Sequence, residues 1–192
     1  MKIILDGMGG DNAPYAVVEG AVLASKEIEH QILIIGKEEL INEELKKYSY
    51  DGEKIKVVHA EEVISNDDAP VRAVRSKKNS SIVMGINMVK RGEGDIFISA
   101  GSTGALLAGG LFILGRIQGI DRPALASIYP ILGGVPSLLV DAGANSDCKP
   151  NNLLEFGIMG NQYRGGSFQR LHSDQGGIRT AGAEQDELHR QR

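Results

Sequence analysis

The chain has 192 residues and a net charge of −4, a balance that argues against a nucleic-acid-binding protein. Apolar residues make up 42% and charged residues 24%, as in soluble globular proteins, and no apolar run reaches the ~18 residues that span a bilayer. The single Cys148 excludes a disulfide framework within the chain, and we expect a cytoplasmic protein.

The first third of the chain predicts strands and helices in alternation. Buried strands are expected where short apolar runs occur, and helices where apolar residues recur at helical spacing. The expected elements are a strand at 2–5, a helix at 15–26, a strand at 31–35, a helix at 37–47 and a strand at 55–59.

The same alternation continues to about residue 141. Residues 66–69 are typical of a helix start, with Pro70 in the first helical turn. Further elements are expected as a helix at 82–90, a strand at 95–99, a helix at 104–115 and strands at 124–131 and 137–141. This order predicts an α/β fold: a three-layer, mostly parallel sheet with right-handed crossovers.

The composition changes after Gly160, in mid-helix, directly after the segment LLEFGIMG. Residues 161–192 hold five Arg and no Lys, whereas residues 1–160 hold eleven Lys and five Arg. Apolar residues are too sparse after this point to offset the entropy of ordering the segment. We therefore expect residues 1–160 to be the folded part, and residues 161–192 to be a disordered tail or a segment foreign to the chain.

The first glycine-rich loop, DGMGGDNAP at residues 6–14, joins a strand to a helix. Its glycines allow successive backbone N–H groups to face one anion, and Asp11 and Asn12 are candidate helix caps. The spacing matches neither GxGxxG nor a P-loop, whose Lys is absent. An anion site and a plain capped turn are equal alternatives on spacing alone.

The second loop, SAGSTGA at residues 99–105, follows an apolar strand and opens an apolar helix. Gly101 and Gly104 permit close backbone approach, while Ser102 and Thr103 add hydroxyl groups beside the helix start. A plain cap needs only one hydroxyl, so this pattern favours a phosphate site over a structural turn.

The third loop, DAGANSDCKP at residues 141–150, also follows an apolar strand. Asp141 and Asn145 are polar residues at a strand end, where open α/β sheets bind their ligands. An ordinary Gly/Asn turn explains the pattern equally well. Cys148 has no neighbouring activating group in the sequence and is expected to be a small packing residue rather than a nucleophile.

Basic residues cluster between Ala69 and Ser81, in the run APVRAVRSKKNSS. The cluster consists of Arg72, Arg75, Lys77 and Lys78. A solvated helix face is the usual explanation for such a run, and a docking patch for an acidic partner is the alternative. No metal site is expected, because the histidines show no ligand spacing: His30, His59, His172 and His189.

Four segments in this order resemble the phosphate acyltransferases of bacterial phospholipid synthesis, the PlsX family. They cover residues 1–160 and read MKIILDGMGGDNAP, DDAPVRAVRSKKNSS, GDIFISAGSTGALLAGG and LLVDAGANSDCKPNNLLEFGIMG. The resemblance stops near Gly160, and the family continues with further α/β structure. It implies a Rossmann-like fold related to phosphotransacetylases and to isocitrate and isopropylmalate dehydrogenases.

The resemblance implies an enzyme that moves a long acyl chain from acyl carrier protein to inorganic phosphate, giving acyl phosphate. It further implies no cofactor or metal, a homodimer, and loose association with the inner membrane surface. The phosphate or substrate is expected at Gly9, Gly10, Asp11, Asn12, Ser102, Thr103, Gly104 and Asn145. The four basic residues of the cluster are expected to meet the carrier protein, and the catalytic residues are not identified.

Two other interpretations remain open at this point. One is an enzyme of the same fold with different chemistry, such as a phosphotransacetylase using acyl coenzyme A. A nicotinamide dehydrogenase is disfavoured, because Gly36 and Lys37 stand where an acidic residue would bind the ribose. The other interpretation is an inactive fragment that at most binds acyl carrier protein.

Overall fold

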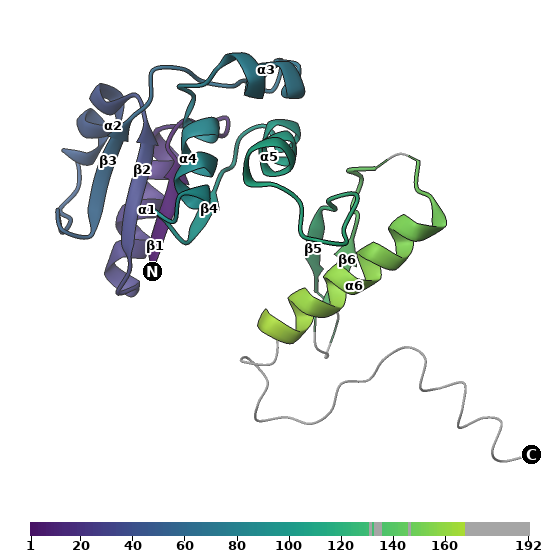
Figure 1. The fold of residues 1–192 in the computed structure, drawn as a ribbon. Helices are drawn as coiled ribbons and strands as arrows, with labels where there is room; N and C mark the ends of the chain where they lie inside the picture. The colour runs from purple at the N-terminus through teal and green to yellow at the C-terminus, as the bar shows by residue number, and fades with distance from the viewer. Residues whose placement is uncertain (131, 133–135, 146, 168–192) are drawn as a thin grey trace, which may run out of the picture. The chain divides into compact units, whose positions relative to one another are not determined.

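The computed structural model describes residues 1–130, 132, 136–145 and 147–167. Its internal contacts divide the chain into two units. The first unit runs from Met1 to Gly119, and the second begins at Ile120. Figure 1 shows the elements of each unit.

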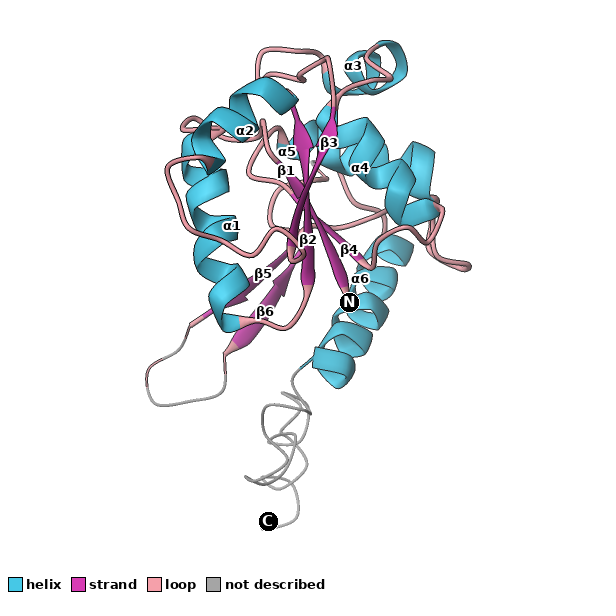
Figure 2. Ribbon diagram, turned by 90° about the vertical axis from the view of Figure 1, so that its left-hand side faces the viewer, coloured by secondary structure: helices cyan, strands magenta, loops and turns pink. Residues whose placement is uncertain are grey.

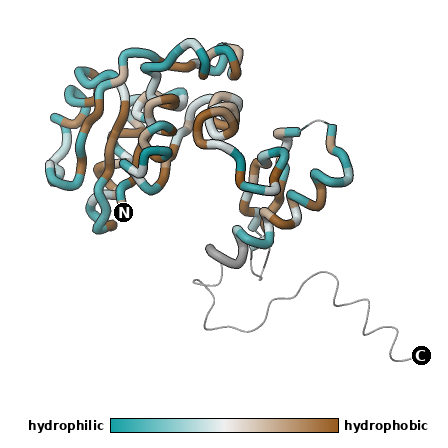
Figure 3. Tube along the Cα trace, viewed as in Figure 1, coloured by the Kyte–Doolittle hydropathy of each residue, from teal (hydrophilic) through white to brown (hydrophobic). Residues whose placement is uncertain are grey.

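The first unit is built on a four-stranded parallel sheet in the order β3-β2-β1-β4. The strands are β1 (Lys2–Asp6), β2 (Gln31–Gly36), β3 (Ile55–His59) and β4 (Ile96–Ile98). In the register of the sheet, Ile4 of the central β1 lies opposite Leu33 of β2 and Phe97 of β4. Figure 3 shows β2 as an apolar segment, as expected for a strand covered on both faces.

Helices cover both faces of this sheet, so the three-layer arrangement expected from the sequence is confirmed (Figure 2). One face carries α1 (Tyr15–Glu27) and α2 (Glu38–Leu45), and the other carries α4 (Ser81–Lys90). Shorter helical segments complete this side: α5 (Thr103–Gly109) and the π-helix η1 (Gly110–Leu114) pack beside α4, and α3 (Pro70–Ser76) packs against α5.

The core of the first unit follows the alternation of side chains along the strands. Ile34 packs with Val18 and Val22 on the α1 side of the sheet, and none of the three is more than 1% exposed. Its neighbour Ile35 packs with Met88 of α4 on the other side. Both faces of β2 are therefore buried.

The second unit contains a separate antiparallel pair, β5 (Ala126–Tyr129) and β6 (Ser137–Val140), with α6 (Pro150–Ser167) packed against β6. The sequence predicts both strands, but their pairing differs from the parallel arrangement expected from the alternation. A parallel pair needs a crossover of a dozen or more residues, and residues 130–136 are too few for one.

The helix α6 continues through the composition change at Gly160 and is described as far as Ser167. Residues 161–167 are thus helical, and residues 168–192 lie outside the described residues. The tail boundary at 160 stays a prediction. None of the helices in the described residues is long and apolar enough to span a membrane.

Candidate active site

Two of the three loops meet at the point where the strand order of the sheet reverses. From β1 the order runs through β2 to β3 on one side, while β4 lies on the other side of β1. Because β1 and β4 are parallel neighbours, the loops at residues 7–14 and 99–102 leave the same edge of the sheet. Open α/β sheets bind ligands in the crevice at this switch point.

The two loops approach each other so closely that only glycine fits at the contact. A methyl group on Gly9 would lie 2.5 Å from the Asp6 Oδ2 atom and 2.8 Å from the Gly101 backbone nitrogen. Gly10 has a φ of +100°, which disfavours any side chain, and it faces Ala100. Gly9 and Gly10 therefore lie beside the second loop, as their proposed shared role requires.

Asp6 and Ser99 join these loops through their side chains, and neither was among the predicted site residues. Asp6 is 1% exposed, and its carboxylate accepts hydrogen bonds from the Met8 N–H at 3.1 Å and the Ser99 hydroxyl at 2.7 Å. The Ser99 oxygen accepts a further bond from the Gly101 N–H at 3.0 Å. The sequence signal was a polar residue at or directly after the end of each apolar strand.

Asp11 and Asn12 line the groove at this edge but do not cap α1, so the capping expectation is wrong. The N-cap is Pro14, which makes no side-chain hydrogen bond. Instead the Ala16 N–H donates to the backbone carbonyl of Asn12 at 3.0 Å. The side chains of Asp11 and Asn12 are exposed, and both residues line the same groove as Gly9 and Gly10.

The predicted residues of the second loop have different structural settings. Ser102 is buried and caps α5, because its hydroxyl accepts a hydrogen bond from the Ala105 N–H at 3.3 Å. Gly104 packs against α3, where a methyl group would lie 2.7 Å from the Pro70 Cγ atom. Thr103 is exposed at the first position of α5. Ser102 and Gly104 therefore make structural contacts and Thr103 is accessible, and the phosphate role of all three residues stays a prediction.

The third loop belongs to the second unit and is organised around Asp141. This residue has a φ of 65°, in the left-handed region, and its N–H donates to the Leu125 carbonyl at 2.7 Å. The Asn145 side-chain amide donates to Asp141 Oδ1 at 2.9 Å and to the Pro123 carbonyl at 3.1 Å. Asn145 thus holds the loop in shape, and its substrate role stays a prediction.

Cys148 lies next to the same carboxylate. Its thiol donates to Asp141 Oδ2 at 3.6 Å, and burial together with this neighbour raises the pKa of the Cys148 thiol. A raised pKa keeps the sulfur protonated and disfavours a nucleophilic role. In the described part of the chain, no three His, Cys, Asp or Glu side chains gather as metal ligands.

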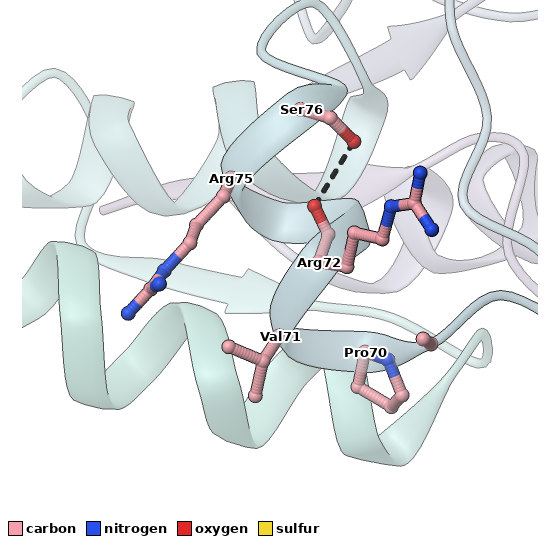
Figure 4. Close-up of a pocket in the computed structure, with 6 residues that line it drawn as sticks. Pro70, Val71, Arg72, Arg75 and Ser76 are labelled. Carbon is pink, nitrogen blue, oxygen red and sulfur yellow. Dashed lines mark hydrogen bonds between the residues drawn. The ribbon is translucent and has the colours of Figure 1, made fainter.

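The basic run separates into two settings. Arg72 and Arg75 are exposed on α3 and line a shallow cavity of about 590 Å³ (Figure 4). The Arg75 guanidinium lies over the ring of Phe112, 5.3 Å from its centre, and this ring is itself 50% exposed. Arg75 therefore shares a surface with an aromatic ring, whereas the Arg72 side chain points to the other side of α3 (Figure 4).

The two lysines make contacts within the fold. Lys77 donates to Asp68 Oδ2 at 2.6 Å and to the Val63 carbonyl at 2.9 Å, and this ion pair lowers the pKa of the Asp68 carboxyl. Lys78 donates to the Val74 carbonyl at 3.2 Å. The four basic residues are thus not one patch.

A parallel α/β sheet with glycine-rich loops meeting at its switch point defines the class of open-sheet, ligand-binding α/β proteins. The chain belongs to the fatty acid synthesis protein family, whose family model matches residues 1–190. The family resemblance of the four sequence segments is therefore confirmed.

Curated relatives agree with this assignment. A phosphate acyltransferase of Alkaliphilus oremlandii is 58% identical over 163 residues, and that of Clostridioides difficile is 55% identical over 163 residues. Each match covers 85% of this chain and 48% of the relative. The chain thus spans about half the length of the curated relatives it matches.

One solved structure supports the fold alone. A phosphotransacetylase from Streptococcus pyogenes superposes with a TM-score of 0.62 at 21% sequence identity. The match covers 82% of this chain and 51% of the phosphotransacetylase. The expected relationship in fold to phosphotransacetylases is confirmed.

Proposed function

We propose that this protein takes part in transferring a long acyl chain from acyl carrier protein to inorganic phosphate. The observation that carries the proposal is the meeting of the loops at residues 7–14 and 99–102 at the switch point of the sheet. The name phosphate acyltransferase, borne by relatives up to 58% identical, supplies the reaction class.

In the proposed reaction a phosphate oxygen attacks the thioester carbonyl carbon. A carbon–oxygen bond forms, the carbon–sulfur bond breaks, and the thiolate of the carrier leaves and takes up a proton from solvent. Such a reaction needs a held anion and donors for the developing oxyanion, and no covalent enzyme intermediate. We assign the phosphate end to Gly9, Gly10, Asp11, Asn12, Ser102, Thr103 and Gly104.

Thr103 provides the test of the phosphate site, because its side chain is exposed at the first position of α5. Thr103→Val removes the hydroxyl at nearly constant size. We expect the phosphate concentration for half-maximal rate to rise about tenfold, while Thr103→Ser behaves as the parent. The assay follows release of free carrier protein from a long-chain acyl carrier protein. Identical phosphate dependence in Thr103→Val would remove Thr103 from the site.

We propose that the carrier protein docks on Arg72 and Arg75, the exposed cations of α3. An acidic partner would pair with these side chains, and Phe112 adds apolar area beside Arg75. Arg72→Glu with Arg75→Glu should weaken carrier binding more than tenfold, and added salt should weaken binding to the parent. Lys78→Glu tests whether Lys78 also contributes to docking. Lys77 is left unchanged, because it forms an ion pair with Asp68. Salt-insensitive binding would contradict docking by charge.

The proposal includes a homodimer that associates peripherally with the inner membrane surface. Light scattering of the purified protein tests the dimer, and flotation with anionic vesicles tests the association. A monomer at micromolar concentration, or the absence of flotation, would remove the corresponding part.

Acyl coenzyme A is the second candidate donor, favoured by the similarity in fold to a phosphotransacetylase. A screen of acyl carrier protein and coenzyme A thioesters of equal chain length separates the two. A dehydrogenase is not favoured, since β2 ends at Gly36 and the next residue is Lys37.

A further inference from the structure

A groove of about 500 Å³ begins at the glycine loops and follows α1 along one face of the sheet; we call it the α1 groove. Its polar end is formed by Asp6 and by residues of the two loops, including Asp11, Asn12 and Ser99. The rest of its lining is apolar and comes from α1 and from strands β1, β2 and β4. Representative members are Leu5, Val17, Ile28 and Ile98.

The apolar part of the groove is open to solvent within the first unit. Ile98 of β4 is 45% exposed, although its strand lies in a sheet whose other strands are well covered. On the helix side, nothing lies within 4 Å of the position where a side chain of Gly20 would begin. The α1 groove thus combines a mostly apolar lining with a few polar groups at one end, a composition typical of a ligand site.

We propose that the α1 groove holds the hydrocarbon chain of the acyl substrate, with the reacting carbonyl and phosphate at the glycine loops. The proposal rests on the proposed function, because it assigns a place to the acyl group of that reaction. An amphiphile with a polar head and a long apolar tail matches the α1 groove, because one end of the groove is polar and the rest of its lining is apolar. Burial of the tail supplies affinity in proportion to its length.

Alkylphosphonates of 8 to 14 carbons, used below their micelle concentrations, are suitable probes because they cannot turn over. In calorimetric titrations of the full chain, we expect affinity to rise about fourfold per added methylene, the factor that corresponds to ~0.8 kcal/mol. Gly20→Leu should place a side chain in the groove without a clash, since that space is empty. We expect it to weaken binding of the 14-carbon probe at least tenfold and to flatten the dependence on length.

Glu19→Leu is the matched control, because it adds the same side chain to an exposed position of α1 that does not line the groove. It should leave the dependence on chain length unchanged. If the parent binds long probes with a steep length dependence and Gly20→Leu binds them equally, the tail lies elsewhere and this inference fails alone. A parent with no length dependence also overturns it, and indicates a protein segment or second copy in the groove. If neither the probes nor inorganic phosphate bind at all, the proposed function fails with it.

Discussion

The two units of the chain exclude water from their apolar side chains to different degrees. In the first unit Ile34 and Val18 are fully buried between the sheet and α1. In the second unit Ile128 of β5 is 54% exposed and Leu153 of α6 is 63% exposed. The described residues of the second unit bury few apolar side chains, chiefly Ile120 and Phe156.

Polar contacts organise the second unit where the first relies on its core. Glu155 is 3% exposed and accepts hydrogen bonds from the backbone N–H groups of Asp121 and Arg122 and from the Asn151 amide. Hydrogen bonds to a carboxylate each contribute about 1.5–3 kcal/mol net, similar to a fully buried aliphatic side chain, but the first unit buries many more such side chains. The first unit should therefore hold most of the stability, and the second should open more readily.

Amide hydrogen exchange provides the strongest test of this difference. The free energy of local opening ranges from near zero to the global free energy of unfolding. We expect the amides of β1 and β2 to exchange at least ~10³-fold more slowly than those of β5 and β6, which corresponds to ~4 kcal/mol. Equal protection in both units at low protein concentration would mean that the exposed apolar face of the second unit is covered in solution.

A matched pair of isoleucines tests the difference side chain by side chain. Ile34→Ala in β2 should lower the free energy of unfolding by about 2–5 kcal/mol, because it leaves a cavity in a closed core. Ile128→Ala in β5 should cost less than about 1 kcal/mol, because that side chain is already half in water. Urea titrations followed by circular dichroism measure both, and equal losses would refute the proposed distribution of stability.

Two glycines of the first unit differ in whether the fold itself requires them. Gly9→Ala should cost about 1–3 kcal/mol, because its methyl group would meet the Gly101 nitrogen and the Asp6 carboxylate. Gly20→Ala should be neutral or stabilise by up to ~1 kcal/mol, because the site is open and alanine favours the helix. Thermal unfolding of the two variants makes the comparison, and a harmless Gly9→Ala would show that the two loops do not need their close contact.

Local sequence patterns predict the elements of the first unit well. The strand predicted at 55–59 has the same bounds as β3, and α3 begins at Pro70, where the sequence predicts the first helical turn. The long helix expected at 104–115 is instead α5 followed by the π-helix η1, a change of hydrogen bonding that periodicity does not reveal. The pairing of β5 with β6 was harder to predict than the strands themselves. Their antiparallel arrangement follows from the short connection between them and not from the composition of either strand.

The candidate site was only partly predictable for the same reason. The glycines of both loops stand out in the sequence, whereas the bond between Asp6 and Ser99 joins residues 93 positions apart. Neighbours along the chain also need not share a surface: Lys77 follows Arg75 closely but pairs with Asp68. Residue type and spacing identify loops, and only the folded sheet reveals which side chains meet.

The smallest expected effect is a change in the pKa and reactivity of the Cys148 thiol, which lies in a polar loop of the second unit. Asp141 raises the pKa of this thiol both as its hydrogen-bond partner and through its negative charge, after burial itself. Asp141→Asn removes the charge, keeps the shape and tolerates the left-handed backbone at this position. The thiol pKa should therefore fall, and alkylation by iodoacetamide near pH 7.5 should become several-fold faster because more thiolate is present.

Asp147→Asn is the matched control, since Asp147 raises the same pKa more weakly. Mass spectrometry across a pH series measures the rates; the Asp141→Asn profile should shift to lower pH, and the Asp147→Asn profile should shift less. A rate that rises equally in both variants would indicate that the loop has opened. An unchanged Asp141→Asn profile would show that burial alone sets the thiol pKa, and that the Asp141 carboxylate does not organise this loop in solution.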